Sequence, residues 1–416
     1  MSSSLKMGNA PKIAIIGAGA GGCFSAIQVF DALAGRCSVE IFEKSKEPLS
    51  KLRISGGGRC NVTHNLFDPE ALSLKYPRGN KELKYAFQTF QPKDTIEWFR
   101  QRGIRLKVEP DGRMFPESDS SETIINCFLA ELQKRKIPIH FSKSLVGLYK
   151  EDSIFRVLWE GGDSSYFDRI IFATGSNRKI WSLLEILGHK IVPPVPSLFT
   201  FGVSDSDIIN LSGITVQNVH IKISPKGKPQ VGPLLITHWG FSGPAALKLS
   251  AYEARTFYDL DYKTKITINW LGDKSTPDVE NFLLTNKDQS PNIRLSNLNF
   301  SLPSRLWDWI LQNQLVSGQK RLSELSNHQI RNLALKLTAS EFLMTSKSIY
   351  KEEFVTAGGV SRKDINFSKM ESKIIPGIFF TGEVIDIDGV TGGFNFQNAW
   401  TTGTLAAQGL KISLNI

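Results

Sequence analysis

Apolar residues fall into successive patterns along this chain of 416 residues. In the first part, short apolar runs over residues 13–16 and 170–173, and a strand-like run over residues 39–42 that Glu40 interrupts, are separated by stretches with helical spacing. Short continuous runs of this kind are typical of buried parallel strands, whose two faces are both covered by other elements. The pattern therefore predicts an α/β fold with a parallel sheet.

The middle of the chain has a different pattern. Residues 193–196 contain three prolines and predict a boundary, because such a run cannot continue regular structure. Beyond it, residues 219–223 and 266–270 alternate with period two, as half-buried antiparallel strands do. From about residue 276 to 346 the spacing becomes helical. We therefore expect a β unit that carries a helical insert.

A glycine-rich turn follows the first apolar run and precedes a helix-like stretch. Gly17, Gly19 and Gly22 have the spacing G-x-G-x-x-G, and the second apolar run ends at Glu43, about twenty residues further on. Gly17 permits the tight turn, Gly19 lets the backbone approach a pyrophosphate, and Gly22 lets the helix pack closely on the strand. The helix N-terminus offers N–H groups to the anion, and Glu43 can accept from a ribose hydroxyl. These features predict dinucleotide binding.

A second glycine-rich stretch covers residues 55–61. Three consecutive glycines beside Arg59 and Asn61 favour neither a stable helix nor a packed strand. They favour a backbone loop that wraps phosphate, with Arg59 to neutralise charge, although a plain surface turn is the alternative. Cys60 lies in this loop without a visible resolving partner, so we interpret it as a loop residue rather than a reacting thiol.

A third glycine-rich turn covers residues 237–244 and holds a histidine and a serine. It is compatible with a loop that faces an active cleft or, equally, with a tight strand-to-helix turn whose His238 caps backbone. No acid lies nearby in sequence to complete a hydrolase triad, and the pattern is not a nucleophile elbow.

The formal net charge of +10 is uneven, because residues 44–113 hold 15 Lys and Arg against 8 Asp and Glu. This excess indicates either a solvated surface or a basic rim for an anionic cofactor or acidic substrate. The four cysteines are far apart and form no C-x-x-C, which suits a reducing cytoplasm and argues against zinc, so we expect no metal site. No run of eighteen apolar residues predicts a membrane span, and the opening residues lack an apolar signal core. We expect a cytoplasmic protein.

Taken together, these stretches resemble one family. The chain looks like the BaiN/RdsA-type NAD(P)/FAD-dependent oxidoreductases, also known as aminoacetone-oxidase-family FAD-binding flavoproteins. The motifs that carry the resemblance are GAGAGG, SGGGRCNVT at residues 55–63, RMFP at 113–116, THWGFSGP at 237–244, and the stretch 381–403 with TGE and GGFNFQNAWTTG. Two departures are visible: Phe394 stands where tyrosine is usual, and Ser176 where a second glycine is common. The first removes a hydroxyl near the flavin.

The resemblance implies a Rossmann-type two-dinucleotide-binding FAD domain, split by an inserted β-barrel-like domain that carries a helical subdomain. We expect the FAD domain to comprise residues 1–194 and 357–416, the barrel-like domain residues 195–275 and 347–356, and the helical subdomain residues 276–346. The flavin of a non-covalently bound, extended FAD is expected between the FAD domain and the inserted domain.

The motifs and the resemblance assign a large set of residues to this cofactor. Glu383 would hold the ribityl chain, and the N-terminus of the last helix would aim positive partial charge at the flavin. The full set is Gly17, Ala18, Gly19, Ala20, Gly21, Gly22, Glu43, Lys44, Lys51, Ser55, Gly56, Gly57, Gly58, Arg59, Cys60, Asn61, Val146, Ala173, Thr174, Gly175, Gly382, Glu383, Asp388, Gly392, Gly393, Phe394, Asn395, Gln397, Asn398 and Ala399.

The predicted reaction is hydride transfer between NAD(P)H and an unsaturated or carbonyl-conjugated small molecule by way of the flavin, with His238 and Arg59 as candidates for substrate polarisation. Because no second G-x-G-x-x-G is present, NAD(P)H would visit the flavin transiently. The alternatives are an oxidase that uses O₂, a nucleic-acid-associated flavoprotein such as a tRNA-modifying enzyme, and a non-catalytic FAD-stabilised scaffold. Residues 275–350 hold only 8 basic against 6 acidic residues, which argues against a helical nucleic-acid reader there. The oligomeric state stays open.

Overall fold

The structure, a computed structural model, describes residues 10–298, 300–347 and 355–416. Contacts divide the chain into two compact units, which are treated separately below. The first unit comprises Met1–Pro194 and Thr356–Ile416, and the second comprises Val195–Val355.

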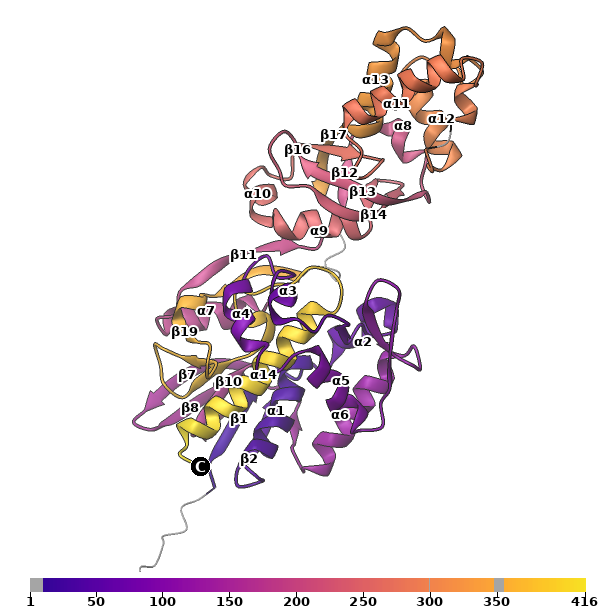
Figure 1. Cartoon of the computed structure of the whole chain (residues 1–416). Coiled ribbons are helices and arrows are strands. Elements are labelled where there is room, and N and C mark those ends of the chain that lie inside the picture. The colour runs from indigo at the N-terminus through magenta and orange to yellow at the C-terminus, as the bar shows by residue number, and fades with distance from the viewer. Residues whose placement is uncertain (1–9, 299, 348–354) are drawn as a thin grey trace, which may run out of the picture. The chain divides into compact units, whose positions relative to one another are not determined.

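A seven-stranded, mostly parallel sheet forms the centre of the first unit (Figure 1). On the strand Lys12–Ile16, Ile15 pairs in parallel with Ile41 on one side and with Ile171 on the other, and all three are fully buried. The order across the sheet is β19 (Ile365–Asn366), β20 (Glu371–Ser372), β21 (Ile378–Phe380), β10 (Arg169–Phe172), β1 (Lys12–Ile16), β2 (Ser38–Phe42) and β6 (Ile139–His140). The apolar runs are therefore buried strands, as the sequence predicts.

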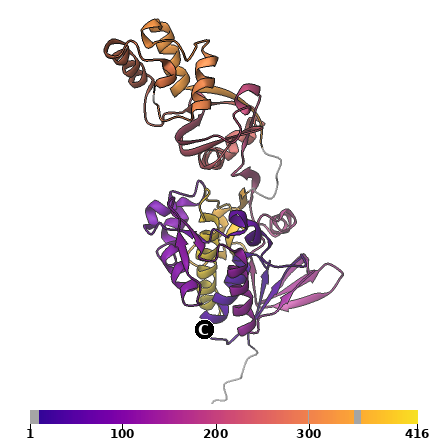
Figure 2. The same ribbon diagram turned by 90° about the vertical axis from the view of Figure 1, so that its right-hand side faces the viewer.

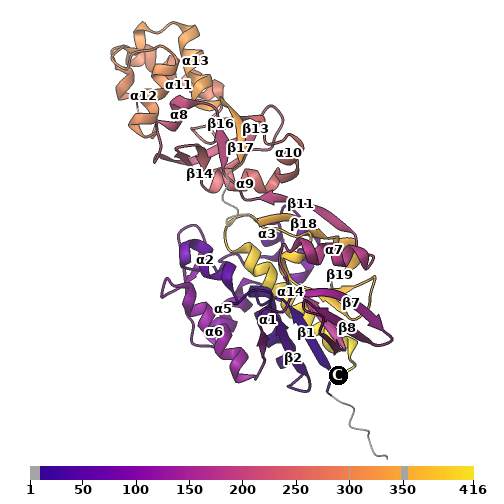
Figure 3. The ribbon, with the colours of Figure 1, turned by 180° about the vertical axis from the view of Figure 1, so that it is seen from behind.

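Two helices from opposite ends of the sequence pack against each other in this unit. These are α1 (Ala20–Ala32), which directly follows β1, and α14 (Phe394–Ser413), the last helix of the chain. Aromatic side chains hold them together, with the Phe24 and Trp400 ring centroids 5.2 Å apart. Figure 3 shows α2 (Ser50–Gly58), α5 (Pro92–Arg100) and α6 (Ser121–Lys134) gathered beside α1.

A small antiparallel sheet projects at the side of the first unit (Figure 2). It consists of β7 (Leu145–Glu151), β8 (Ile154–Trp159) and β9 (Ser164–Phe167), and Trp159 stacks on Phe42 of β2 at 4.3 Å. The remaining elements of this unit are β3 (Thr63–His64), α3 (Pro69–Ser73), α4 (Asn80–Ala86), β4 (Leu106–Val108), β5 (Arg113–Pro116), α7 (Arg178–Ile186), and the pair β11 (Ile191–Ser197) and β18 (Val355–Val360) at the junctions with the second unit.

The second unit is a closed six-stranded barrel with helices attached. Around the barrel the order is β12 (Phe201–Val203), β15 (Gly240–Ser242), β14 (Gln230–Thr237), β13 (Thr215–Ile223), β16 (Thr264–Asn269) and β17 (Ser340–Lys347). Its helices are α8 (Ser206–Ile209), α9 (Pro244–Tyr252), α10 (Ala254–Asp259), α11 (Thr276–Gln289), α12 (Ser304–Asn313) and α13 (Asn327–Thr338). One continuous core joins the barrel to α11, α12 and α13.

Three local expectations from the sequence need correction. β17 is a barrel strand although it lies within residues 276–346, because Phe342 and Met344 alternate with exposed residues in place of a helical spacing. The proline run at residues 193–196 does mark the boundary between the two units, but it lies inside β11, which tolerates it because its one partner is β18. His238 and Trp239 form the two-residue link of the β14–β15 hairpin, so this is a strand-to-strand turn.

No helix in the described part of the chain is long and apolar enough to cross a membrane.

Candidate dinucleotide-binding site

The turn after β1 depends on its glycines for three different reasons. Gly17 has a φ of 108°, and a Cβ there would lie 2.7 Å from the Ala173 carbonyl oxygen. A Cβ on Gly22 would collide with the Gly17 carbonyl oxygen, so the helix can approach the strand only without a side chain. A Cβ on Gly19 would meet nothing within 4 Å. Gly19 therefore faces open space, where a ligand can approach the backbone.

The N-terminus of α1 begins at this open position. Its N-cap residue is Gly19, no side chain caps the helix, and no acidic residue lies in the first turn. The first N–H groups of a helix have no partners within the helix, and they carry positive partial charge. Ala20 and Gly21 form the first turn, and the carbonyl of Gly19 accepts from Cys23 N at 3.0 Å. The site thus has the geometry that binds a phosphate group.

Glu43 lies directly after β2 and is held beside the same turn. Its Oε2 accepts from the Ala18 N–H at 2.8 Å, while Oε1 accepts from Ser45 N at 2.9 Å and Ser45 Oγ at 2.6 Å. A carboxylate has about four acceptor positions, so one remains for a ribose hydroxyl. The neighbouring Lys44 is exposed.

The second half of α2, from Ser55 onward, is a loop, as the sequence predicts. Backbone angles in α2 leave the helical region at Ser55, and Gly56, Gly57 and Gly58 all have positive φ. A Cβ at Gly57 or Gly58 would again meet nothing within 4 Å. The loop therefore presents bare backbone to open space, as a phosphate-wrapping loop does.

Arg59 is engaged within the chain. Its Nη1 lies 2.6 Å from Glu109 Oε1 and 3.5 Å from Asp119 Oδ1, and its guanidinium stacks on the Phe115 ring at 4.0 Å. Cys60 is fully buried, and burial raises the pKa of its thiol to about 12. A thiol with that pKa is protonated at neutral pH, which supports its interpretation as an unreactive loop residue.

The loop at Asn61 meets the start of α14, more than three hundred residues later. The Asn61 side-chain oxygen accepts from Gly393 N at 2.9 Å, and its amide nitrogen donates to Thr63 O at 3.0 Å; this amide orientation is the one that satisfies both partners. A Cβ on Gly393 would lie 2.6 Å from Thr63 O. The glycine-rich loop at residues 55–61 and the glycine-rich turn before α14 are therefore packed against each other.

Several residues at the start of α14 form contacts that hold the preceding loop, residues 389–393, in place. Asn395 binds the backbone of Gly389 twice, accepting at 2.8 Å and donating at 3.0 Å. Phe394 is buried, stacks on His64 at 4.7 Å, and its carbonyl accepts from Tyr76 OH at 2.7 Å. Gly392, with a φ of 136°, lies next to this stack.

Gln397 lies in the protein interior instead of covering a ligand. Its Oε1 accepts from Thr63 Oγ1 at 2.6 Å and from Thr95 Oγ1 at 2.9 Å, and its Nε2 donates to Thr401 Oγ1 at 3.1 Å. Its side chain is fully buried. The sequence assigns Gln397 to the cofactor, but its hydrogen-bonding groups face three threonines.

Glu383 follows β21 and lies beside the end of β10. It pairs with Lys51 at 2.8 Å and accepts from the Thr356 N–H at 3.1 Å, while a Cβ on Gly175 would lie 3.4 Å from its Oε2. Lys51 also reaches Ser176 Oγ at 3.5 Å. This group brings Glu383, which the sequence assigns to the ribityl chain, next to Lys51 and Gly175, which it assigns to the cofactor.

Two buried polar atoms near these strand and helix ends have no partner in the described residues: Thr174 Oγ1, just after β10, and Asn398 Oδ1, the fifth residue of α14. Buried polar groups without hydrogen bonds are uncommon, and a bound ligand is one explanation of them. In the same region, a Cβ on Gly21 would touch Ala399 at 3.6 Å, and one on Gly382 would touch the same residue at 3.6 Å. The open backbone and the unpartnered atoms together fit an extended dinucleotide.

Asp388 and Val146 occupy different surroundings from the rest of the predicted set. Asp388 is fully buried and forms a two-bonded ion pair with Arg78. This ion pair thus joins two segments that are 310 residues apart in sequence. Val146 is 51% exposed and lies where the β7–β8 register shifts.

His238 lies in the second unit. It is exposed at the β14–β15 turn and packs edge-on against Trp239 at 4.2 Å. The predicted residues after β1, β10 and β21 and at the start of α14 therefore lie close together, whereas Val146 and Asp388 have other surroundings and His238 belongs to the second unit.

The basic excess of residues 44–113 is mostly balanced within the chain. In the described structure, ten of the fifteen basic residues there form ion pairs with carboxylates.

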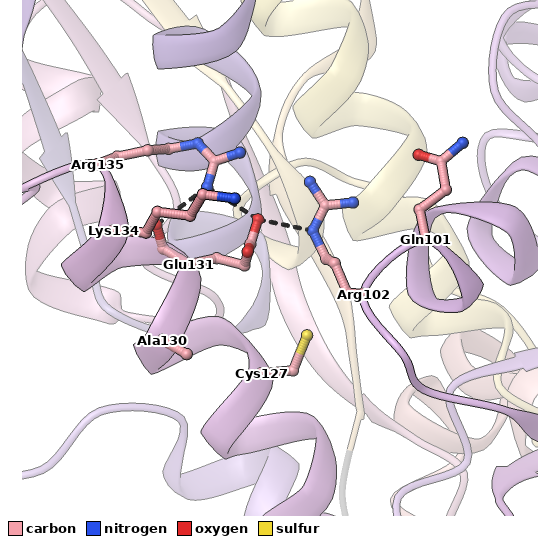
Figure 4. Close-up of a pocket in the computed structure, with 7 residues that line it drawn as sticks. All are labelled: Gln101, Arg102, Cys127, Ala130, Glu131, Lys134 and Arg135. Atoms are coloured by element: carbon pink, nitrogen blue, oxygen red, sulfur yellow. Dashed lines mark hydrogen bonds and ion pairs between the residues drawn. The ribbon is translucent and has the colours of Figure 1, made fainter.

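Two pockets lie elsewhere in the first unit. One is lined by Gln101, Arg102, Cys127, Ala130, Glu131, Lys134 and Arg135, where Glu131 bridges both arginines (Figure 4). The other is lined by residues of β1, β2, β6, β8 and β9, and neither contains a predicted cofactor residue. Among the described residues, no group of three or more His, Cys, Asp and Glu side chains is arranged to hold a metal ion.

Sequence reasoning missed Arg78, Tyr76 and His64. They support Asp388 and Phe394 from positions more than three hundred residues away in sequence, and no local pattern marks them.

The fold and the glycine-rich turns define a Rossmann-type α/β protein with an FAD-binding fold and an inserted barrel. The chain belongs to the family described as HI0933-like protein Rossmann domain, whose model matches residues 11–409. This confirms the resemblance found in the sequence, since the family is that of the BaiN/RdsA-type proteins.

Similar proteins cover nearly the whole chain. A ribosomal RNA dihydrouridine synthase of Escherichia coli is 29% identical over 410 residues, which are 95% of this chain and 97% of that protein. A 3-dehydro-bile acid delta(4,6)-reductase of Clostridium scindens is 26% identical over 411 residues, covering 95% and 98% of the two chains. The fold is also that of 3-ketosteroid delta1-dehydrogenase from Sterolibacterium denitrificans, with a TM-score of 0.50 at 11% identity over 98% of this chain and all of the other.

Proposed function

We propose that this chain is an FAD-dependent oxidoreductase that transfers hydride between NAD(P)H and a substrate with a carbon–carbon double bond conjugated to a carbonyl group. The observation that carries the proposal is the bare backbone after β1, where the uncapped N-terminus of α1 and the open side of Gly19 adjoin Glu43. This arrangement suits a pyrophosphate and a ribose in adjacent positions.

The first unit supplies groups for each part of the cofactor. The α1 N-terminus would bind the pyrophosphate, Glu43 the ribose of the adenosine, and Glu383 with Lys51 the ribityl chain. The uncapped N-terminus of α14 would direct positive partial charge at the flavin ring. FAD bound there would supply a two-electron carrier that accepts and donates hydride.

The choice of substrate chemistry rests on the relatives. Dihydrouridine differs from uridine by two hydrogens across a double bond that is conjugated to a carbonyl, and a delta(4,6)-reductase of a 3-dehydro compound acts on double bonds of the same kind. The two names therefore share one reaction class. His238 is our candidate for polarising the substrate carbonyl. Arg59 would polarise the substrate only after its ion pair with Glu109 is broken.

A second candidate function narrows the substrate to uracil bases in RNA. Two relatives, from Escherichia coli and from Haemophilus influenzae, are ribosomal RNA dihydrouridine synthases, each 29% identical and matched over at least 94% of this chain. The sequence favoured a small molecule, and these relatives make RNA a serious alternative.

The test is to follow the flavin absorbance of the purified chain without oxygen while NADPH, and separately NADH, is added. We expect rapid bleaching, and then recovery of colour on addition of either ribosomal RNA or a 4-en-3-one steroid. Recovery with RNA alone would select the second candidate. Yellow protein that neither nucleotide bleaches would contradict the nicotinamide step and favour an oxidase. Protein that cannot be loaded with FAD would contradict the whole proposal.

A further inference from the structure

A long stretch of the second unit contains no acidic residue. Between Asp207 and Glu253 the chain has four lysines and neither Asp nor Glu. The stretch is continuous in space as well, because β13, β14 and β15 are neighbouring barrel strands and α9 packs on all three. These three strands and α9 therefore contribute no carboxylate of their own, although Asp273 pairs with His220 of β13 and Glu341 accepts from Ser224 at the base of the β13–β14 loop.

The loop between β13 and β14 presents two of these lysines to solvent. Lys226 and Lys228 are exposed, and neither forms an ion pair with a described residue. The base of the loop is fixed by hydrogen bonds from Gly227 N to Ile223 O at 2.9 Å and from Ser224 N to Lys265 O at 2.9 Å. The two ammonium groups thus extend from an ordered turn.

Glu341 lies at the base of this loop, but it is paired with another lysine. Glu341 of β17 accepts from Ser224 Oγ at 3.1 Å, but its other oxygen pairs with Lys265 at 3.2 Å. In the first unit the situation differs: of the five basic residues without an ion pair in the stretch 44–113, four adjoin an acid in sequence, as Lys93 adjoins Asp94. Lys226 and Lys228 have no such neighbour, so their charge is available to an external anion.

We propose that the β13–β14 loop binds the phosphate backbone of an RNA substrate through Lys226 and Lys228. The inference rests on the second candidate function above. Lysine binds phosphate as a flexible point charge and reads no base, so the loop would add affinity and orientation while the sequence is recognised elsewhere. Each lysine that neutralises a phosphate releases counterions, which makes its contribution measurable through the salt dependence of binding.

The experiment uses the full chain loaded with FAD and a fluorescently labelled single-stranded segment of ribosomal RNA. The test variant is Lys226→Gln with Lys228→Gln. The matched control is Lys263→Gln with Lys274→Gln, which removes two exposed lysines from the same unit, one paired with Asp261 at 3.0 Å and one next to Asp273. We expect the slope of log affinity against log salt to become shallower by about 1.4 in the test variant, at about 0.7 per phosphate contact. The control should keep the wild-type slope.

Equal slopes in the wild type, test variant and control would overturn the inference. So would a loop-dependent affinity for polyglutamate or for phosphatidylglycerol vesicles that equals the affinity for RNA, because the occupant would then be a different polyanion. Anaerobic bleaching by NADPH is measured on the same samples. Bleaching with equal RNA slopes refutes only the loop, whereas a loop-dependent slope without bleaching refutes only the proposed hydride transfer.

Discussion

The basic residues of two regions, residues 44–113 of the first unit and the β13–β14 loop of the second, differ in how many of them form ion pairs. In the first unit, residues 44–113 hold the larger basic excess, yet most of those side chains end on carboxylates of the same chain, as Arg59 does on Glu109. There the groups best placed for an anion are backbone N–H groups at Gly19 and the start of α1. In the second unit, Lys226 and Lys228 are fewer, and neither forms an ion pair with a described residue. The position of the counter-charges, more than the number of cations, decides where an external anion can bind.

The largest expected effect comes from breaking an internal pair of the first unit. Asp388→Asn leaves Arg78, with 12% of its side chain exposed, without a full counter-charge. Loss of one partner of a buried pair typically costs about 3–5 kcal/mol of unfolding free energy. Urea denaturation followed by tryptophan fluorescence measures this, with Asp163→Asn as control, because Asp163 pairs with Lys143 on the surface at 3.1 Å. Equal midpoints for the two variants would mean that the internal pairing contributes little.

The next effect sharpens the role of the bare backbone. Glu43→Ala removes the carboxylate that faces both Ala18 N and the proposed ribose position. A hydrogen bond to a charged group contributes about 1.5–3 kcal/mol, so FAD affinity should fall roughly ten- to a hundredfold. Titration of the FAD-free chain by flavin fluorescence measures the affinity. Glu47→Ala, an exposed acid in the same loop, should bind FAD like the wild type.

A smaller effect concerns a buried titrating group of the first unit. His189 bonds Ser372 Oγ at 2.8 Å, and burial lowers its pKa below the ordinary value. The unfolded chain therefore binds more protons in mild acid, so stability that is full above about pH 6.5 is lost as the pH falls. We expect His189→Gln to be less stable at neutral pH but to depend less on pH between 7.5 and 5.5, by about 1 kcal/mol or less. The exposed His328→Gln should keep the wild-type pH dependence of the melting temperature.

The smallest effect is expected in the barrel loop. Lys226→Gln with Lys228→Gln changes two exposed side chains that form no ion pair with a described residue, so the unfolding free energy should change by less than about 0.5 kcal/mol. Thermal unfolding measures this alongside the RNA titration. A larger loss would show that the lysines serve the fold, and the contrast between the two units would then fail.

The sequence predicts the parts of this molecule whose causes are local. The strand, turn and helix from Lys12 to Ala32 follow from adjacent residues, and so does the position of Glu43 after β2. Gln397 could not be placed in this way, because its three threonine partners come from Thr63, Thr95 and its own helix, and nothing in the motif indicates which way the side chain points.

Long-range pairing limits the prediction in the same way elsewhere. Arg59 is separated from Glu109 by fifty residues, and Asp388 is separated from Arg78 by 310. The motifs identify both as candidates for the cofactor, while only the folded chain reveals the partners that hold them. β17 was missed because its alternation is confined to one strand next to a helical stretch.

The central claim is that the open backbone at Gly19 is a cofactor site, and Gly19→Val tests it most directly. A Cβ there would meet nothing within 4 Å apart from its chain neighbours, and the φ of −78° is accessible to valine, so we expect the FAD-free variant to melt close to the wild-type temperature. We predict that the wild-type chain binds FAD and that the valine, filling the space of the pyrophosphate, abolishes binding. A folded Gly19→Val chain that binds FAD with wild-type affinity would contradict the account.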